Sequence, residues 1–414
     1  MKKRLLSILL ALCIFFAFST IAFADAQPDD NGDYTPGNGT NGDGSGNGAG
    51  DGNGDVGVIS PGTDFAARAV ILIEASTGRV LYEYNADEAM LPASVTKIMT
   101  VLLVMEALAN DAFTLECIVT VSEFAASMGG SQIFLEPNER MSVYDLLKSV
   151  IIASANDAAV ALAELVSGNY ETFITKMNTR AAELGMTNTT FANSTGLEGD
   201  GNSVNMTSAR DIAIMSAALV EYEKVLEIAV VWMDTIRNGE FGLTNTNRLV
   251  RFYNGINGLK TGFTARAGYC ISATARRDGM QLIAVIMGSE TRDSRNEAAR
   301  KLLDYGFSNY SLASFAEGNI EDIPVRAGVS NSVTLTRQSF SIVLSRGENL
   351  RVEERIELPE FLSAPVQAGD VVGRVVYILD GNEIGISEII AAETVERIGF
   401  FRLFGRMIQH FFLV

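Results

Sequence analysis

Three short motifs, which follow one another along the chain, contain the residue types that an acyl-transfer reaction needs. They are Ser94 with Lys97, Ser154 with Asn156, and the consecutive Lys260, Thr261 and Gly262. They offer a hydroxyl nucleophile, an amine base, a second hydroxyl beside an amide, and a basic clamp for a carboxylate, which serine acyl transfer without histidine requires. The only histidine is His410, among the last five residues, so a Ser-His-Asp triad or a multi-histidine metal site is poorly supported. We therefore expect a lysine to move the proton, and we expect no metal and no cofactor.

The Ser94–Lys97 pair fits the start of a helix. A spacing of three residues puts both side chains on one helical face, and the free N–H groups of a helix N-terminus favour a developing oxyanion. Lysine acts as a base near neutral pH only where burial or a neighbouring cation lowers its pKa, and Lys260 is a candidate for that cation. The pair alone is not specific, because average composition gives about one or two Ser-x-x-Lys matches in a chain of this length.

The two later motifs each have a structural alternative. Ser154 fits a proton-relaying hydroxyl and Asn156 an amide that holds a substrate backbone, but taken alone either is better explained as a cap of the following helix. Lys260 and Thr261 offer a charge and hydrogen bonds to a carboxylate, and Gly262 lets a substrate approach closely. The alternative there is an exposed edge strand that bears a protective lysine.

The motifs must be positioned by strands that flank a helical region. Apolar runs on either side of Ser76-Thr77-Gly78 predict a hairpin over 69–84, and apolar residues with helical period after Pro92 predict a helix over 94–109. Further helices are predicted over 142–152, 157–167, 170–184, 207–220 and 294–306, and strands over 255–261, 268–276 and 280–288. This order predicts an α+β domain whose sheet pairs the N-terminal hairpin with the late strands.

The chain changes character after about Tyr310. Residues 320–395 hold short β-rich runs between turn residues and no evident helix, which predicts a small all-β second domain. The last residues, 396–414, fit a helix with one polar arc among aromatic and aliphatic residues. The members of that arc are Arg402, Arg406, Gln409 and His410. Such an amphipathic helix is typical of a membrane interface, and the alternative is a helix docked on its own β domain or on a sister subunit.

The N-terminal residues are typical of an exported protein. Three cations precede an apolar run to about Phe18, and Ala22-Phe23-Ala24 is a small-x-small cleavage site, which predicts a signal peptide over 1–24. A retained membrane anchor is the alternative. Residues 25–64 are rich in glycine, asparagine and aspartate and hold no Lys, Arg or Glu, which predicts a disordered linker. A calcium-binding repeat is less well supported there, because no nine-residue period is present.

Charge and cysteine content limit the possible partners. The net charge is −18, and removal of the three cations in 1–24 moves it to −21. No basic excess is present to bind phosphates, so we expect no nucleic-acid partner. Cys117 and Cys270 remain after the signal peptide; whether they pair is left open, and the apolar run around Cys270 predicts a buried, inert thiol.

With their surroundings, the motifs resemble the D-alanyl-D-alanine carboxypeptidases, the low-molecular-mass penicillin-binding proteins of peptidase family S11. The matching segments are Pro92-Ala-Ser-Val-Thr-Lys97, Ser154-Ala-Asn-Asp-Ala158, Asn193-Ser-Thr-Gly-Leu197, and Gly258-Leu-Lys-Thr-Gly-Phe-Thr264 followed by Ala267-Gly-Tyr269. The resemblance implies a catalytic domain of the penicillin-binding transpeptidase/β-lactamase type over 65–312, an antiparallel sheet flanked by helices. It also implies a β-rich domain over 313–395 and the amphipathic helix over 396–414.

The resemblance implies roles by position. Ser94 would be the acylated nucleophile, Lys97 its general base, and Ser154 a partner in proton transfer. The substrate would be held by Asn156, by the strand of Lys260, Thr261 and Gly262, by the N–H groups of Ser94 and Phe263 as oxyanion hole, and by Arg295, whose neighbour Arg292 is a rival.

The implied reaction removes the terminal D-alanine from peptidoglycan pentapeptide stems during cell-wall synthesis. β-Lactams would acylate the same serine as covalent inhibitors. Signal, linker and tail would place the enzyme outside the cell, at the outer face of the cytoplasmic membrane or in the cell wall.

Three rival functions share parts of this pattern. A class A β-lactamase needs a glutamate that positions the deacylating water, but no Glu-x-x-x-Asn segment follows Ser154 at a suitable distance, and Ala155 stands between Ser154 and Asn156. A D,D-endopeptidase that cuts peptide cross-links has the same three motifs. An inactive wall-binding scaffold is the remaining alternative, although no catalytic position is lost.

Overall fold

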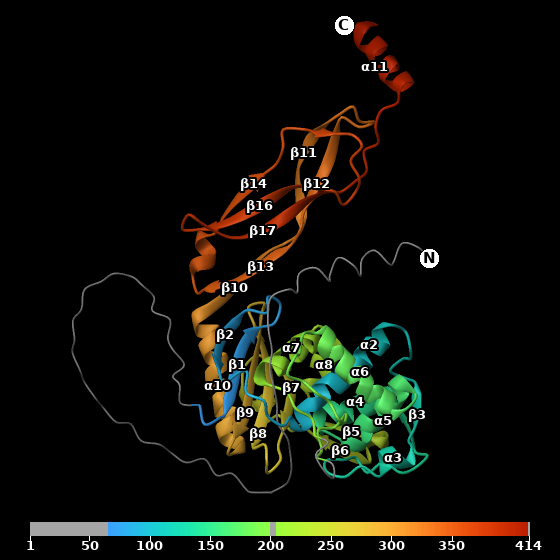
Figure 1. Ribbon diagram of the computed structural model, residues 1–414, viewed down its shortest axis with the longest axis vertical. Helices are drawn as coiled ribbons and strands as arrows, with labels where there is room; N and C mark the ends of the chain where they lie inside the picture. Colours follow the sequence, from blue (N-terminus) through green and yellow to red (C-terminus); the bar gives the residue numbers. More distant parts are fainter. Residues whose placement is uncertain (1–64, 199–203, 413–414) are drawn as a thin grey trace, which may run out of the picture. The chain divides into compact units, whose positions relative to one another are not determined.

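The computed structural model describes residues 65–198 and 204–412, and the chain divides into two compact units, residues 1–308 and 309–414 (Figure 1). The predicted signal peptide and linker lie outside the described residues.

A five-stranded antiparallel sheet in the order β2-β1-β9-β8-β7 is the centre of the first unit. Its strands are β1 (Ala69–Glu74), β2 (Val80–Tyr84), β7 (Ile256–Gly262), β8 (Tyr269–Arg277) and β9 (Met280–Ser289). The predicted pairing of the N-terminal hairpin with the late strands is confirmed, because β1 pairs with β9 from Ala69↔Met287 to Glu74↔Leu282. Strand β7 therefore lies at an edge of the sheet, where one side of its backbone has no strand partner.

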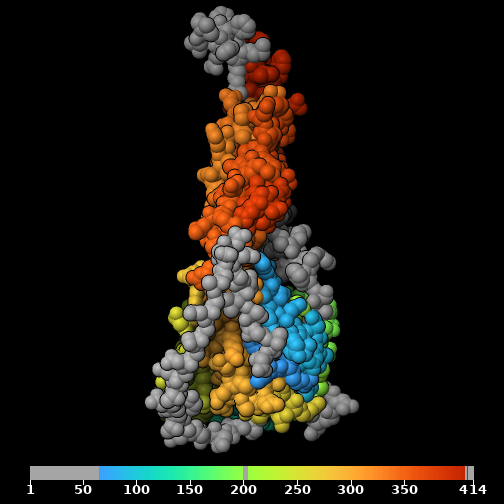
Figure 2. Space-filling view, turned by 90° about the vertical axis from the view of Figure 1, so that its left-hand side faces the viewer, coloured from blue at the N-terminus to red at the C-terminus, as the bar shows by residue number. Residues whose placement is uncertain are grey.

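Helices cover both faces of this sheet (Figure 1). On one face lies α10 (Arg292–Asn309), where a Cβ on Gly306 would come within 2.5 Å of Leu282, so only glycine permits the close approach. The other face carries α7 (Ala209–Val220), whose Ser216 hydroxyl lies 2.8 Å from that of Ser272 on β8. Strand β2 and α10 lie side by side in both views (Figure 2), joined by ring contact between Tyr82 and Tyr305. The strands are apolar almost throughout because both faces are buried.

The remaining elements of the first unit form a helical region with two small hairpins. The helices are α2 (Lys97–Ala109), α3 (Glu123–Ala126), α4 (Val143–Ile152), α5 (Asn156–Ser167), α6 (Tyr170–Glu183), α8 (Glu223–Ala229) and α9 (Leu249–Phe252). The hairpins pair β3 (Ile118–Thr120) with β4 (Arg140–Ser142), and β5 (Met233–Ile236) with β6 (Phe241–Thr244). One apolar core joins these helices, except α9, to the sheet.

The start of the helix that carries Lys97 differs from the prediction. The helix predicted over 94–109 begins only at Lys97, and residues Ala93–Thr96 form a 3₁₀ turn. Ala93 has φ +62°, which no helix accommodates, so the chain enters the helix through a tight turn.

The second unit is all-β up to its last helix, as predicted. Its strands are β10 (Tyr310–Phe315), β11 (Gly318–Arg326), β12 (Ser332–Arg337), β13 (Phe340–Ser345), β14 (Glu353–Glu357), β15 (Leu362–Ser363), β16 (Val371–Leu379) and β17 (Asn382–Ala391). A 3₁₀ turn over Glu348–Arg351 interrupts them. The fully buried Tyr377 stacks on Phe340 at a centroid distance of 4.5 Å, within a separate apolar core.

A terminal helix, α11 (Phe400–Phe412), ends the described chain, as predicted. Phe400, Phe401 and Phe404 on it are exposed. Among the described residues, no helix has both the length and the apolar character that crossing a bilayer requires.

Candidate active site

The 3₁₀ turn before α2 places Ser94 directly against Lys97. Lys97 is completely buried, and its Nζ lies 2.9 Å from Ser94 Oγ, so the two side chains meet as their spacing predicts. The same amine donates to the carbonyl of Thr195 at 2.8 Å, in the Asn193–Leu197 segment. Since Ser94 is only 8% exposed, its hydroxyl is shielded from bulk water but lies at the surface of a cleft.

Two glycines let neighbouring segments pack on this turn. A Cβ on Gly262 would lie 2.4 Å from the Cβ of Ala93, and a Cβ on Gly196, whose φ is +80°, would lie 1.9 Å from the carbonyl oxygen of Ala93. Neither approach leaves room for a side chain. The end of β7 and the Asn193–Leu197 segment are therefore held against the turn that carries Ser94.

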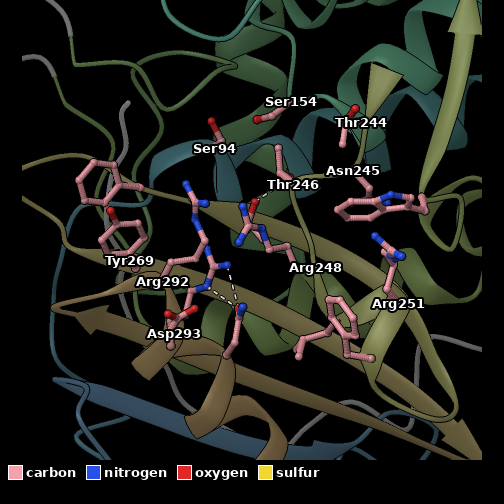
Figure 3. A pocket seen from close by; sticks show the side chains of 18 of the residues that line it. Ser94, Ser154, Thr244, Asn245, Thr246, Arg248, Arg251, Tyr269, Arg292 and Asp293 are labelled. Carbon is pink, nitrogen blue, oxygen red and sulfur yellow. Dashed lines mark hydrogen bonds between the residues drawn. The ribbon is translucent and has the colours of Figure 1, made fainter. Parts of the chain in front are cut away.

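Ser154 lines the same cleft just before α5, and Asn156 is the first residue of that helix. Ser154 has φ +64°, and its hydroxyl is buried with no hydrogen-bond partner among the described residues. Asn156 donates from its backbone to Ser131 at 2.7 Å and from Nδ2 to Gly129 at 2.6 Å, while its Oδ1 has no such partner. The N-cap of α5 is Ala155, so neither side chain is the helix cap that the alternative required. A strained residue with an unsatisfied buried hydroxyl is typical of a functional position, and the hydroxyl of Ser154 is turned toward Ser94 in Figure 3.

Lys260 is buried rather than exposed at the sheet edge. It is 4% exposed, and its Nζ donates to the carbonyl of Thr261 at 2.9 Å. Burial, and then the positive charges of Lys97 and Arg295, hold the pKa of Lys260 well below its ordinary value. The structure therefore contradicts the alternative of a protective edge-strand lysine.

Arg295 adds a second buried cation from α10. Its Nη1 donates to the carbonyl of Cys270 on β8 at 3.3 Å, and its Nε and Nη2 donate to Asn296. Burial lowers the pKa of Arg295 to about 10, so the guanidinium keeps its charge at neutral pH. Its rival Arg292 also lines the cleft but is only half-buried. Cys270 is buried, as predicted, and neither Cys270 nor Cys117 forms a disulfide among the described residues.

These groups surround one cleft of about 920 Å³ (Figure 3). Of the residues singled out from the sequence, those lining it are Ser94, Ser154, Thr261, Gly262, Phe263, Tyr269, Arg292 and Arg295. The other three do not line the cleft but contact residues that do. Lys97 bonds to Ser94, Asn156 to Ser131 and Lys260 to Thr261. The ring of Phe263 stacks on Tyr269 at a centroid distance of 4.0 Å and forms one wall.

Part of the cleft wall carries no sequence motif. Its members include Ser131, Trp232, Thr246, Arg248 and Arg251. Thr246 is fixed by Thr261, whose hydroxyl donates to it at 2.7 Å. The only local signal is the polar run Asn245-Thr246-Asn247 ahead of β7, which is not specific on its own.

The arrangement suits transfer of an acyl group from a substrate that ends in a carboxylate. A serine hydroxyl lies beside an amine, a second hydroxyl faces it, and two buried cations stand at one side. Among the described residues, no group of three or more His, Cys, Asp or Glu side chains is placed to hold a metal ion.

The comparisons with known proteins agree with this geometry. The model of the D-alanyl-D-alanine carboxypeptidase family matches residues 57–291, and that of the C-terminal domain of penicillin-binding protein 5 matches residues 313–397. The D-alanyl-D-alanine carboxypeptidase DacF of Bacillus subtilis is 42% identical over 81% of this chain and 87% of its own length.

Two solved structures extend the likeness to the fold. Penicillin-binding protein 5 of Haemophilus influenzae is 34% identical with a TM-score of 0.71, over 82% of this chain and 100% of that one. Penicillin-binding protein D2 of Listeria monocytogenes in its ampicillin-bound form is 33% identical with a TM-score of 0.55, over 60% of this chain and 100% of that one.

Proposed function

The chain belongs to the family of D-alanyl-D-alanine carboxypeptidases and is a serine-type carboxypeptidase that removes the terminal D-alanine from peptidoglycan pentapeptide stems, and we propose that Ser94 is its nucleophile. The observation that carries this assignment is the 2.9 Å contact between Ser94 Oγ and the buried Lys97 amine. Burial and the positive charges of Lys97 and Arg295 lower the pKa of Lys260. Lys97 acts as the base in this proposal and is neutral when it does so, because only a neutral amine accepts a proton.

Acylation follows from the order of these groups. Lys97 takes the proton of Ser94 while Oγ attacks the carbonyl carbon of the penultimate D-alanine, and the N–H groups of Ser94 and Phe263 stabilise the oxyanion. The C–N bond then breaks, and the leaving amine takes a proton through Ser154, whose hydroxyl has no other partner among the described residues. Free D-alanine departs, and water hydrolyses the Ser94 ester with Lys97 again as base.

The substrate is held by charge and by the sheet edge. Lys260, Thr261 and Arg295 bind the terminal carboxylate, since two buried cations hold an anion more strongly than surface cations do. The peptide adds as a further strand along the unpaired edge of β7. The unpaired Oδ1 of Asn156 accepts a hydrogen bond from a substrate N–H.

β-Lactams are covalent inhibitors in this proposal. Ampicillin is bound to the Listeria relative, and a β-lactam carries a carboxylate and a strained amide that match the clamp and the nucleophile. Ring opening by Ser94 leaves an ester whose slow hydrolysis keeps the enzyme inactive.

Two measurements on one variant test the assignment. We expect the wild-type protein to be labelled by a fluorescent penicillin and to remove one alanine from a pentapeptide muropeptide, as followed by mass spectrometry. Ser94→Ala should lose both reactions while keeping the wild-type unfolding temperature. Equal labelling of this variant would remove Ser94 from the mechanism, and fast β-lactam hydrolysis without D-alanine release would identify a β-lactamase instead.

We further propose that the enzyme is exported and lies at the outer face of the cytoplasmic membrane, with α11 in the membrane interface. The support is the predicted signal peptide, the family's action on the cell wall, and the exposed Phe400, Phe401 and Phe404 on α11. Exposed aromatic residues on a terminal helix are favoured at an interface rather than in water.

A further inference from the structure

The cleft is also lined by residues outside the carboxylate clamp of Lys260, Thr261 and Arg295. Thr261 contacts Thr246 at 2.7 Å, and from there the cleft is walled by Arg248, Arg251 and Trp232. Figure 3 shows Tyr269 on one side of Ser94 and Arg251 on the opposite side.

The two sides of Ser94 receive different parts of the substrate. The oxyanion hole uses the N–H of Phe263, and the carboxylate clamp uses Thr261, so the acyl part runs toward Phe263 and the leaving group toward Thr261. This orientation rests on the proposed function. The region around Arg248 and Arg251, reached from Thr261 through Thr246, is therefore on the leaving-group side.

Arg248 and Arg251 are cations without a carboxylate partner. Both are exposed, and neither forms an ion pair with any described residue, in a chain that has 50 acidic and 32 basic residues. Arg251 instead lies over the Trp232 ring at 5.2 Å and over Phe252 at 5.4 Å. By contrast, Arg300 in the same cleft is paired with Glu297 at 3.2 Å. The two unpaired guanidinium groups are thus available to an anion.

The segment that carries these arginines is fixed in place. Asn245 donates to the carbonyls of Ala229 and Val231 at 2.9 and 2.8 Å, and Asn247 donates to Gly258 on β7 at 2.9 Å. Both asparagines are buried. Side chains bonded to backbone on both flanks give a preformed wall, which lowers the entropy lost when a ligand binds.

We propose that Arg248 and Arg251, with the Trp232 ring, form a second anion subsite that accepts leaving groups larger than D-alanine when these carry a further carboxylate. D-Alanine has one carboxylate, which the clamp takes, so it leaves this subsite empty. An amino acid with an acidic side chain, or a neighbouring stem peptide joined through its amine, fills it. The bond chemistry is the same: the amide C–N bond breaks, the acyl group stays on Ser94, and the amine leaves with one proton. The enzyme then cuts some cross-links as well as terminal residues.

A matched set of acyl-D-alanyl-D-amino acid peptides tests the subsite. They end in D-alanine, D-glutamate or D-lysine, and release of each amino acid gives kcat/KM by mass spectrometry. We expect the wild type to prefer D-glutamate over D-lysine by about fivefold, the effect of two exposed ion pairs. Arg248→Gln with Arg251→Gln should bring that ratio close to one. Because both rates come from one preparation, partial misfolding of the variant does not change the ratio.

A control and three outcomes separate the possibilities. Arg276→Gln removes the same charge from an exposed arginine outside the cleft, paired with Glu223, and should keep the wild-type preference. Equal rates for D-glutamate and D-lysine in the wild type, or an unchanged preference in the double variant, would overturn the subsite. If the wild type releases D-alanine and binds penicillin in those cases, the proposed function still stands. No release of any amino acid and no penicillin labelling would overturn the proposed function, and the subsite with it.

Discussion

Lys260 places a positive charge in a buried position where no carboxylate among the described residues pairs with it. Its side chain is 4% exposed, its Nζ bonds only to the neutral carbonyl of Thr261 among the described residues, and Lys97 and Arg295 add repulsion. A substrate carboxylate would relieve this repulsion, so the charge favours substrate binding and opposes folding. Such a trade-off between activity and stability is common at functional sites.

We predict that Lys260→Met is more stable than the wild type at neutral pH and inactive on D-alanine-terminated peptides. Because the pKa of Lys260 is lowered in the folded protein, its destabilising effect is complete below that folded pKa and fades as pH rises toward the ordinary value of 10.5. Urea unfolding should show a gain on the order of 1 kcal/mol at pH 7 that shrinks at pH 10. Lys176→Met, at an exposed lysine, should show no such pH-dependent gain. A Lys260→Met variant that is less stable than the wild type at both pH values would contradict this account.

At the scale of elements, the first turn of α7 anchors the segment that accepts the Lys97 hydrogen bond. The carboxylate of Asp211 is buried and accepts from the hydroxyl of Thr189, which also contacts the hydroxyl of Thr207. These contacts hold the two flanks of the Asn193–Leu197 segment. Burial raises the pKa of Asp211 to about 7, so the neutral carboxyl is favoured in the folded protein.

We predict that this carboxyl makes the protein less stable in mild alkali. An acid whose pKa is raised on folding contributes stability that is complete below its unfolded value of 3.8 and is lost as pH rises through about 7. Between pH 5.5 and 8.5 the loss should be about 2 kcal/mol in the free energy of unfolding. Asp211→Asn should flatten this part of the pH profile, whereas Asp278→Asn, at an exposed turn, should leave it unchanged. An equally steep profile in Asp211→Asn would rule Asp211 out as the cause.

Elements with a long regular pattern could be predicted from the sequence, and those held by side-chain bonds could not. The helix predicted over 170–184 is observed over Tyr170–Glu183, because its apolar face repeats over four turns. The Ser94–Lys97 contact was likewise predictable, since it depends on local spacing. The hydrogen bond from Lys97 to the carbonyl of Thr195 spans 98 residues, and no periodicity in the sequence predicts it.

The part of the cleft wall formed by Trp232, Arg248 and Arg251 was not predicted from the sequence, for the same reason. The hairpin of β5 and β6 and the short α9 have no extended apolar period. Their place beside β7 depends on the amide groups of Asn245 and Asn247, which bond to backbone elsewhere in the chain. The sequence does not show which backbone group an asparagine in a polar run will bond to. It therefore did not predict that Trp232 and Arg248 line the cleft.

For the whole molecule, the distribution of charge separates the tail from the rest of the chain. The chain has a net charge of −18, yet after Glu396 it contains Arg397, Arg402 and Arg406 and no acidic residue. An anionic membrane surface would repel the acidic body and attract this basic segment. The exposed Phe400, Phe401 and Phe404 supply apolar area for insertion, about 1.5–3 kcal/mol for each ring that becomes fully buried.

We predict that deletion of residues 396–414 releases the protein from membranes without changing its rate of acylation by penicillin, since the whole candidate site lies within the first unit. Sedimentation with vesicles that contain anionic lipid should retain the wild type and leave the truncated chain in solution. Arg402→Gln with Arg406→Gln should lose only the salt-sensitive part of binding, because screening acts on charge. Phe400→Ser with Phe404→Ser should lose the part that persists in high salt, because that part depends on apolar burial. If the truncated chain sediments with vesicles as well as the wild type does, the membrane role of α11 is wrong, and the helix instead docks on its own β domain or on a sister subunit.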